Sequence, residues 1–152
     1  MAGDPRWLSA EEQRAWRAWL DAHAALSARL NRGLQAGSGL SLADYDVLVH
    51  LTDVPDGRLR AFELGDGLQW EKSRVSRQVS RMAERGLVAK EPAPEDGRGA
   101  YVTLTAAGRR AIEEAAPAHV ELVRSLVFDG LTAAQVRTLE TIAGSVVRRL
   151  DS

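Results

Sequence analysis

The chain has 152 residues, of which 45% are apolar and 27% charged, so it can form one hydrophobic core beneath a charged surface. It contains no cysteine, which excludes disulfide bonds, thiolate zinc sites and iron–sulfur clusters. No segment reaches the ~18–20 consecutive apolar residues of a membrane helix, and residues 1–6 lack the basic-then-apolar order of a signal peptide. We therefore expect a cytoplasmic protein with no membrane partner.

Charge is distributed unevenly along the chain. The segment 58–110 holds eleven basic and seven acidic residues, a net charge of +4, and the rest of the chain has a net charge of −5. A basic central segment between acidic ends is typical of a module that binds a polyanion. Charged helical surfaces are also often simply solvated, so the distribution alone leaves both interpretations open.

The first part of the chain is predicted to form helices. Ser9 and Glu12 form a capping-box pattern at the start of the first helix, and Ser41 is the expected cap of the second. A third, short helix is expected near Arg60 to Leu64. These three helices are expected to end at runs of glycine, proline and small polar residues, at 37–39, 55–57 and 65–67.

The pattern then changes from helix to strand and back. A fourth helix is predicted from about Lys72 to Arg85. Residues 87–91 and 100–104 are β-prone, and the segment between them has the composition of a tight turn, so a β-hairpin is predicted. Two further helices follow, with threonine caps at positions 105 and 132.

The fourth helix carries three different faces. At 100° per residue, Val75, Val79 and Met82 fall within about 60° of one another and form an apolar face. A row of arginines lies roughly opposite, at positions 74, 77, 81 and 85, with a row of serines beside it, at positions 73, 76 and 80.

Such a helix is suited to bind nucleic acid. Arginine favours bidentate contacts with phosphate and with the edge of guanine, and small hydroxyl side chains let a helix lie deep in the major groove. A solvated charged face is the alternative interpretation. The short helix before it and the hairpin after it favour a winged helix-turn-helix.

These segments resemble the MarR family of winged helix-turn-helix transcriptional regulators. The resemblance is carried by residues 42–48, by residues 74–88 of the fourth helix and first wing strand, by Asp96-Gly97-Arg98 in the wing, and by residues 104–109, LTAAGR. One departure is Trp70, since small or polar residues are more usual before this helix. We interpret Trp70 as a plug in the core and not as a DNA contact.

The resemblance implies a mainly α fold with a small β-hairpin wing and a helical dimerisation domain. A single domain would span residues 1–152, with residues 9–36 and 105–150 forming the dimerisation region and residues 41–104 the winged helix-turn-helix lobe. A homodimer is implied, and the sequence agrees independently, because the first and last helices carry apolar stripes wider than a monomer would readily cover.

The function implied is that of a sequence-specific, double-stranded DNA-binding transcriptional regulator, a homodimeric repressor that binds a pseudo-palindromic operator and is released by a small ligand. The residues expected to contact DNA are Lys72, Ser73, Arg74, Ser76, Arg77, Gln78, Arg81, Asp96 and Arg98. Arg77 points away from the apolar face and is expected to read a base edge, and Arg81 is expected to hold a phosphate. By the resemblance, Arg98 enters the minor groove and Asp96 orients it. Arg85 is interpreted as structural.

The resemblance also implies a small aromatic or anionic effector, bound between the dimerisation helices and the lobe. The residues expected to line that cleft are Trp16, Trp19, His23, Tyr45 and His50. The alternative is that these side chains belong to the packed core or to an interface.

Other functions are less well supported by the sequence. The three histidines are isolated from one another, so no metal site is expected. No hydrolase, phosphate-loop or dinucleotide motif is present, so we expect neither an enzyme nor a cofactor. The competing hypothesis is a winged-helix dimer whose basic face binds an acidic protein partner in place of DNA.

Overall fold

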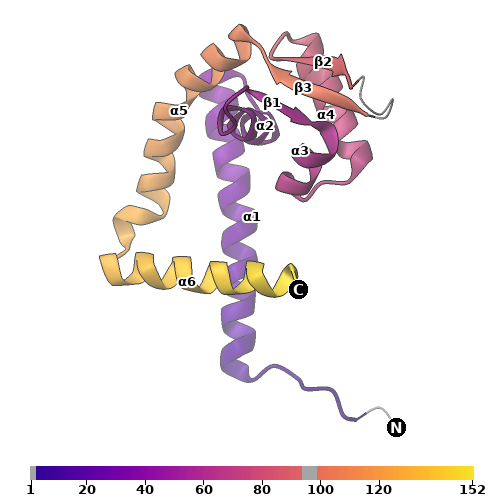
Figure 1. Ribbon diagram of the computed structural model, residues 1–152. Coiled ribbons are helices and arrows are strands. Elements are labelled where there is room, and N and C mark those ends of the chain that lie inside the picture. The colour runs from indigo at the N-terminus through magenta and orange to yellow at the C-terminus, as the bar shows by residue number, and fades with distance from the viewer. Residues whose placement is uncertain (1–2, 94–98) are drawn as a thin grey trace.

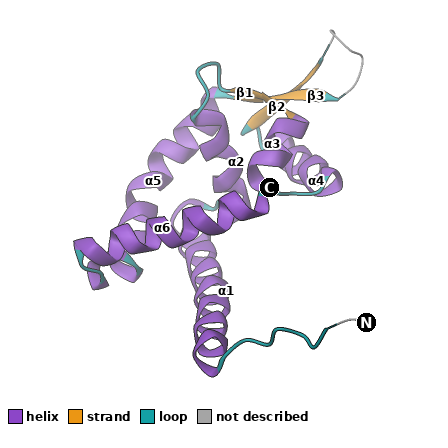
Figure 2. Ribbon diagram, turned by 60° about the horizontal axis from the view of Figure 1, so that its bottom comes forward, coloured by secondary structure: helices purple, strands orange, loops and turns teal. Residues whose placement is uncertain are grey.

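The computed structural model describes residues 3–93 and 99–152 (Figure 1). In chain order the elements are α1 (Ala10–Ser38), α2 (Leu42–Thr52), β1 (Arg58–Arg60), α3 (Ala61–Leu68), α4 (Lys72–Glu84), β2 (Val88–Pro92), β3 (Ala100–Leu104), α5 (Ala106–Leu126), the short 3-10 helix η1 (Phe128–Gly130) and α6 (Ala133–Leu150). Figures 1 and 2 show two regions: a lobe that contains α3, α4 and the sheet, and the long helices α1, α5 and α6 that extend from it.

The helices begin at the caps that the sequence predicts. The Ser9 hydroxyl accepts from the Glu12 N–H at 3.1 Å, and the Glu12 carboxylate accepts from the Ser9 N–H at 2.8 Å. Ser41 forms the same reciprocal pair with Asp44. Each pair satisfies two backbone N–H groups that have no partner inside the helix, which explains why the start sites are readable from sequence.

The third helix is longer than predicted. The sequence suggests an end at residues 65–67, but α3 continues through this segment. A Cβ on Gly65 would lie 3.2 Å from Val75 Cγ2, and a Cβ on Gly67 would lie 2.9 Å from His50 Cδ2. Neighbouring helices therefore pack closely against these glycines, and the glycines do not stop the helix.

The predicted hairpin is present, and a third strand joins it. β2 and β3 pair antiparallel, with Val88 opposite Leu104, and β1 pairs with the other side of β3. The strand order is β1-β3-β2, so β2 lies at an edge, where its proline is tolerated. The sequence did not predict β1, because three residues are too few to show alternation and their partner strand lies far later in the chain.

The hydrophobic core lies within the lobe. Leu48 of α2, Leu64 of α3 and Met82 of α4 have no exposed surface, and Val102 of β3 is 1% exposed. The C-terminal end of α1 and the N-terminal half of α5 close this core, for example through Ile112. The apolar face predicted for α4 is therefore the face that anchors this helix to the rest of the lobe.

The outer parts of the long helices expose broad apolar surface. α6 contains no buried residue, and Leu139, Ile142 and Val146 on one side of it are 40%, 47% and 39% exposed. Trp16 and Trp19 on α1 are also exposed. Within the described ranges, no helix combines the length and apolarity needed to cross a bilayer.

Close backbone packing joins the lobe to α5. The Thr105 hydroxyl caps α5 by accepting from the Gly108 N–H at 2.9 Å and donates to the Gly86 carbonyl at 2.6 Å. A Cβ on Gly108 would overlap the Leu87 carbonyl oxygen. The first turn of α5 therefore lies directly against the backbone that leads into β2.

Candidate nucleic-acid interface

The structure separates the faces of α4 largely as the sequence predicts. Val75 and Val79 are each 3% exposed and anchor the helix in the core. Six of the seven α4 residues predicted to contact DNA are exposed: Lys72, Ser73, Arg74, Ser76, Arg77 and Arg81. We call these six residues the α4 ridge. It is polar and basic along its length, and it lies outside the core.

The start of the α4 ridge is positively polarised. The side chain of the N-cap residue Glu71 makes no capping hydrogen bond. The first backbone N–H groups thus stay available for an anion. The guanidinium of Arg74 lies 4.1 Å from the centre of a Trp70 ring. Trp70 is partly buried against the core, as the sequence suggested. Its ring also supports the Arg74 guanidinium, which the sequence did not suggest.

Gln78 requires a correction. The sequence places it among the DNA contacts, but its side chain is 6% exposed, and its Nε2 donates to Asp44 Oδ1 at 2.6 Å. On a helical wheel Gln78 lies about 40° from Met82, at the margin of the buried face. That position was the available signal, but the partner on α2 could not be foreseen. We therefore leave Gln78 out of the α4 ridge.

Arg85 is structural, as the sequence suggested. Its Nη1 lies 2.6 Å from Asp44 Oδ2, and its Nη2 donates to the Gly39 carbonyl at 3.1 Å. Arg85 thus ties the end of α4 to the junction of α1 and α2. Of the four exposed arginines in this row, Arg85 is bound to other parts of the lobe, and the other three belong to the α4 ridge.

The wing adds a cation that the sequence did not single out. Lys90 on β2 is exposed, and its Nζ donates to the Ser80 hydroxyl of α4 at 2.5 Å. Only the basic charge of the segment pointed to it. The predicted wing residues Asp96 and Arg98 lie outside the described residues.

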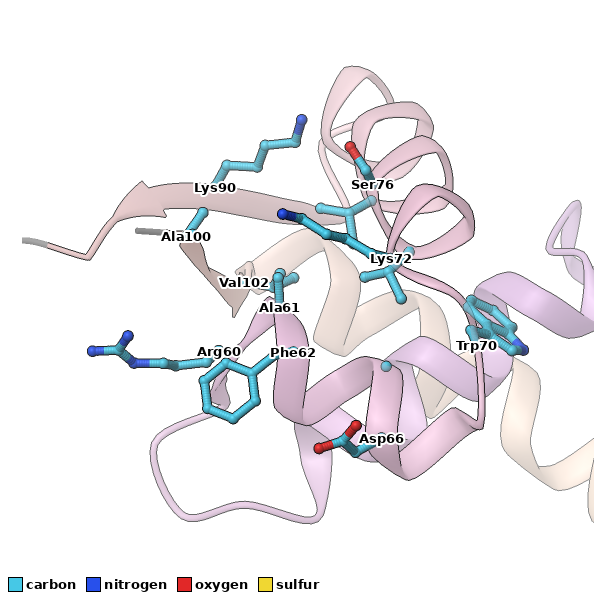
Figure 3. Close-up of a pocket in the computed structure, with 14 residues that line it drawn as sticks. Arg60, Ala61, Phe62, Asp66, Trp70, Lys72, Ser76, Lys90, Ala100 and Val102 are labelled. Atoms are coloured by element: carbon cyan, nitrogen blue, oxygen red, sulfur yellow. The ribbon is translucent and has the colours of Figure 1, made fainter. Parts of the chain in front are cut away.

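A cavity of about 600 Å³ lies beside the α4 ridge, between α3, α4 and the wing strands (Figure 3). Phe62 and Trp70 give it aromatic walls, and Lys72 and Lys90 carry cationic groups beside it. Ser76 of the ridge also lines it. The cavity and the α4 ridge therefore share residues.

The five residues predicted to bind an effector do not form one site within the chain. Trp16, Trp19 and His23 lie exposed on the N-terminal part of α1. Tyr45 is buried against α5. The Nδ1 atom of His50 lies 2.9 Å from a backbone carbonyl oxygen of its own helix. None of the five lines the cavity beside α4 or a smaller cavity between α1 and α5.

Titratable groups meet where α2 packs against α5. The rings of Tyr45 and His119 lie 4.3 Å apart between centroids. Burial raises the pKa of the Asp46 carboxyl above its ordinary value, against the opposing effect of the basic side chains nearby. Burial lowers the pKa of the His119 imidazole, and Asp46 partly offsets this. In residues 3–93 and 99–152 no three acidic, histidine or cysteine side chains cluster as metal ligands would.

The fold and the α4 ridge define a winged helix-turn-helix regulator. Residues 38–99 match the model of the MarR family. The structure of Sco3205, a MarR family transcriptional regulator from Streptomyces coelicolor in complex with DNA, is 38% identical and covers 99% of this chain and 94% of that chain, with a TM-score of 0.94. AbsC, a MarR family regulator from the same organism, is 33% identical and covers 97% of this chain and 99% of that chain, with a TM-score of 0.90. The chain belongs to the MarR family.

A further relative is the HTH-type transcriptional repressor IacR of Pseudomonas putida. It is 39% identical over 80 residues, which are 53% of this chain and 47% of IacR, so the match spans about half of that protein. Family membership confirms the expected winged helix-turn-helix fold and the prediction that the chain is not an enzyme. It does not favour the hypothesis of an acidic protein partner.

Proposed function

We propose that this chain is a sequence-specific repressor of transcription that binds double-stranded DNA as a homodimer. The observation that carries the proposal is the α4 ridge, a basic and polar surface held outward by a buried apolar anchor. The similarity to the DNA-bound Sco3205 and to the repressor IacR supports it. A regulator of this kind acts where the chromosome lies, so the cytoplasmic location is part of the proposal.

The residues of the α4 ridge have different roles in DNA binding according to their position on the helix. Arg77 lies farthest from the apolar anchor and reads a base edge in the major groove. Arg81 and Lys72 hold phosphates, while Ser73, Arg74 and Ser76 lie on the first turns and contact bases or phosphates near the positive helix end. Asp96 and Arg98 enter the proposal through the wing motif of the family.

Dimerisation places two such ridges on one operator. The dimerisation region proposed from sequence, residues 9–36 and 105–150, contains the exposed apolar residues of α1 and α6. A two-fold axis through this region presents the two winged lobes, residues 41–104, to half-sites about one helical turn apart on a pseudo-palindrome.

DNA selection followed by salt titration tests the proposal. Duplexes chosen from a random pool by the wild-type protein should bind with a steep dependence of affinity on salt. Arg77→Ala should cost ~1–3 kcal/mol of binding and relax sequence choice at one position in each half-site. The matched control is Arg148→Ala, an exposed arginine on α6, which should leave affinity unchanged. Failure to select any duplex, or binding only to an acidic protein, would refute the proposal.

The proposed release of the repressor needs a ligand site, and the cavity beside α4 is the best candidate. Its volume of about 600 Å³ suits a small aromatic molecule. Its aromatic walls and its lysines favour a small aromatic anion. Because Lys72 and Ser76 belong to both the cavity and the α4 ridge, a bound anion would compete with DNA phosphate.

Benzoate is a suitable probe of this site. It should lower operator affinity at constant ionic strength, and Lys90→Met should weaken that effect. Acetate at the same concentration is the matched control, since it has the charge without the ring. Equal effects of benzoate and acetate would show that the cavity is not an effector site.

A further inference from the structure

Gln78 lies between a buried carboxylate and an exposed arginine. Its Nε2 donates to Asp44 Oδ1 at 2.6 Å, and its Oε1 accepts from Arg81 Nη2 at 3.1 Å. The first partner is on α2 and the second is on the α4 ridge. One side chain thus connects the interior of the lobe to the surface proposed to bind DNA.

Asp44 fixes the orientation of the Gln78 amide. A carboxylate only accepts hydrogen bonds, so the NH₂ group of Gln78 has to face Asp44 and its carbonyl oxygen has to face outward. Asp44 itself is held by Arg85 at 2.6 Å and by the Ser41 N–H at 2.9 Å, both through Oδ2. Its carboxylate is 6% exposed, so it has little freedom to reorient.

The outward carbonyl then selects the orientation of Arg81. A guanidinium is a rigid fork of donors, and a hydrogen bond to one Nη restricts where the other donors point. An exposed arginine without such a partner samples many rotamers and loses that freedom on binding. A held arginine starts closer to its bound position, which favours binding.

We propose that Gln78 is a positioning residue for Arg81: oriented by Asp44, it holds the Arg81 guanidinium in the direction required for DNA. This inference rests on the proposed DNA-binding function. Gln78 touches no DNA itself, and its contribution to affinity passes through Arg81. The relay of Asp44, Gln78 and Arg81 is specific to this arginine and does not include Arg77.

A double-mutant cycle on the full-length protein tests the relay. Arg81→Ala should weaken binding to the selected duplex about tenfold in the wild-type background and less than about threefold in Gln78→Met. Methionine keeps the length and burial of the side chain. It cannot donate a hydrogen bond to Asp44 or accept one from Arg81 as the Gln78 amide does. Arg77→Ala is the control, and its effect should be the same in both backgrounds.

A merely structural role of Gln78 predicts a different result. If Gln78→Met tilted α4, the effects of Arg77→Ala and Arg81→Ala would shrink together, and this would overturn the proposal. An undiminished effect of Arg81→Ala would overturn it as well.

A second variant covers the case in which Gln78→Met does not fold. In Asp44→Asn an amide can face Gln78 with either group, so the outward carbonyl is no longer enforced and the Arg81→Ala effect should again shrink. An unchanged Arg81→Ala effect in Asp44→Asn would count against the relay. Wild-type protein that binds no duplex would refute the proposed function, whereas binding without coupling would refute only the relay.

Discussion

The lobe buries its apolar residues, whereas the outer helices leave many of theirs exposed. In the lobe, leucines such as Leu48 and Leu64 have no exposed surface within a single chain. In α6 no residue is buried, although Leu139, Ile142 and Val146 form a stripe as apolar as a core helix would carry. The apolar residues of the lobe pack against other residues of the same chain, whereas those of α6 do not.

The difference indicates which part of the chain would form the contact in the proposed dimer. The core of the lobe, closed by the ends of α1 and α5 that meet it, holds the α4 ridge in place within one chain. An apolar stripe left open on α6 is expected to bury itself in an interface. The proposed DNA readout and the proposed dimer contact thus lie in separate regions, and mutations should affect them separately.

The largest expected effect comes from a charge placed on the α6 stripe. Ile142→Glu should convert the dimer to a monomer, because a buried carboxylate without a partner is strongly unfavourable at an interface. Operator affinity should then fall by about 10²–10⁴-fold, since two linked lobes bind far more tightly than one. Sedimentation and operator binding provide the two measurements.

The matched control for this variant is Thr141→Glu. Thr141 is exposed and lies on the opposite side of α6, so the same charge should leave the dimer intact. Dissociation by Thr141→Glu would show that the charge acts on the helix in general. A dimeric Ile142→Glu would show that the stripe does not form the interface.

The same truncation in the two regions should have different consequences. Leu48→Ala should lower the free energy of unfolding by about 2–5 kcal/mol, because it leaves a cavity in a closed core. It should leave the dissociation constant of the dimer unchanged. Leu139→Ala should raise that dissociation constant by about tenfold or more, equivalent to ~1.4 kcal/mol. Denaturant unfolding and sedimentation equilibrium measure the pair, and an unchanged dissociation constant in Leu139→Ala would contradict the division.

The smallest expected effect concerns the boundary between the regions. Because folding lowers the pKa of His119 below its ordinary value of 6.5, the unfolded chain binds a proton there more readily. The free energy contributed by His119 should therefore be lost as the pH falls below about 6.5. The raised pKa of Asp46 acts in the opposite direction, since its contribution is lost as the pH rises above 3.8.

The variant His119→Gln separates these two contributions. It should remove the loss of stability just below pH 6.5 and leave the Asp46 trend, in which stability rises as the pH falls. Unfolding curves across pH 4–8 would measure this. An unaltered pH profile would show that the His119 imidazole stays hydrated in the folded protein.

Local signals account for the part of the fold that the sequence predicts. Capping pairs such as Ser9 with Glu12 lie three residues apart and specify helix starts without reference to the rest of the chain. The apolar face of α4 likewise follows from its own spacing. The exposure of the α4 ridge could be predicted for the same reason.

The features that the sequence did not predict depend on distant partners. β1 exists because β3 lies beside it, and Gly65 packs closely against Val75 of the next helix. Gln78 is buried because Asp44, on another helix, accepts its hydrogen bond. In each case the deciding contact is tertiary, and the type and spacing of the residues do not predict which distant residue will make it. The shared cavity beside α4 is likewise formed only when α3, α4 and the strands of the sheet assemble.

The missing side chain at Gly108 has a mechanical consequence. The backbone of the first turn of α5 contacts the Leu87 backbone directly, with no side chain between them. We therefore expect this junction to be stiff. In the proposed dimer, a change in the angle between the two α5 helices is expected to rotate each lobe together with its α5 helix. In the proposed dimer, the distance between the two α4 ridges would then depend on the contact between the subunits.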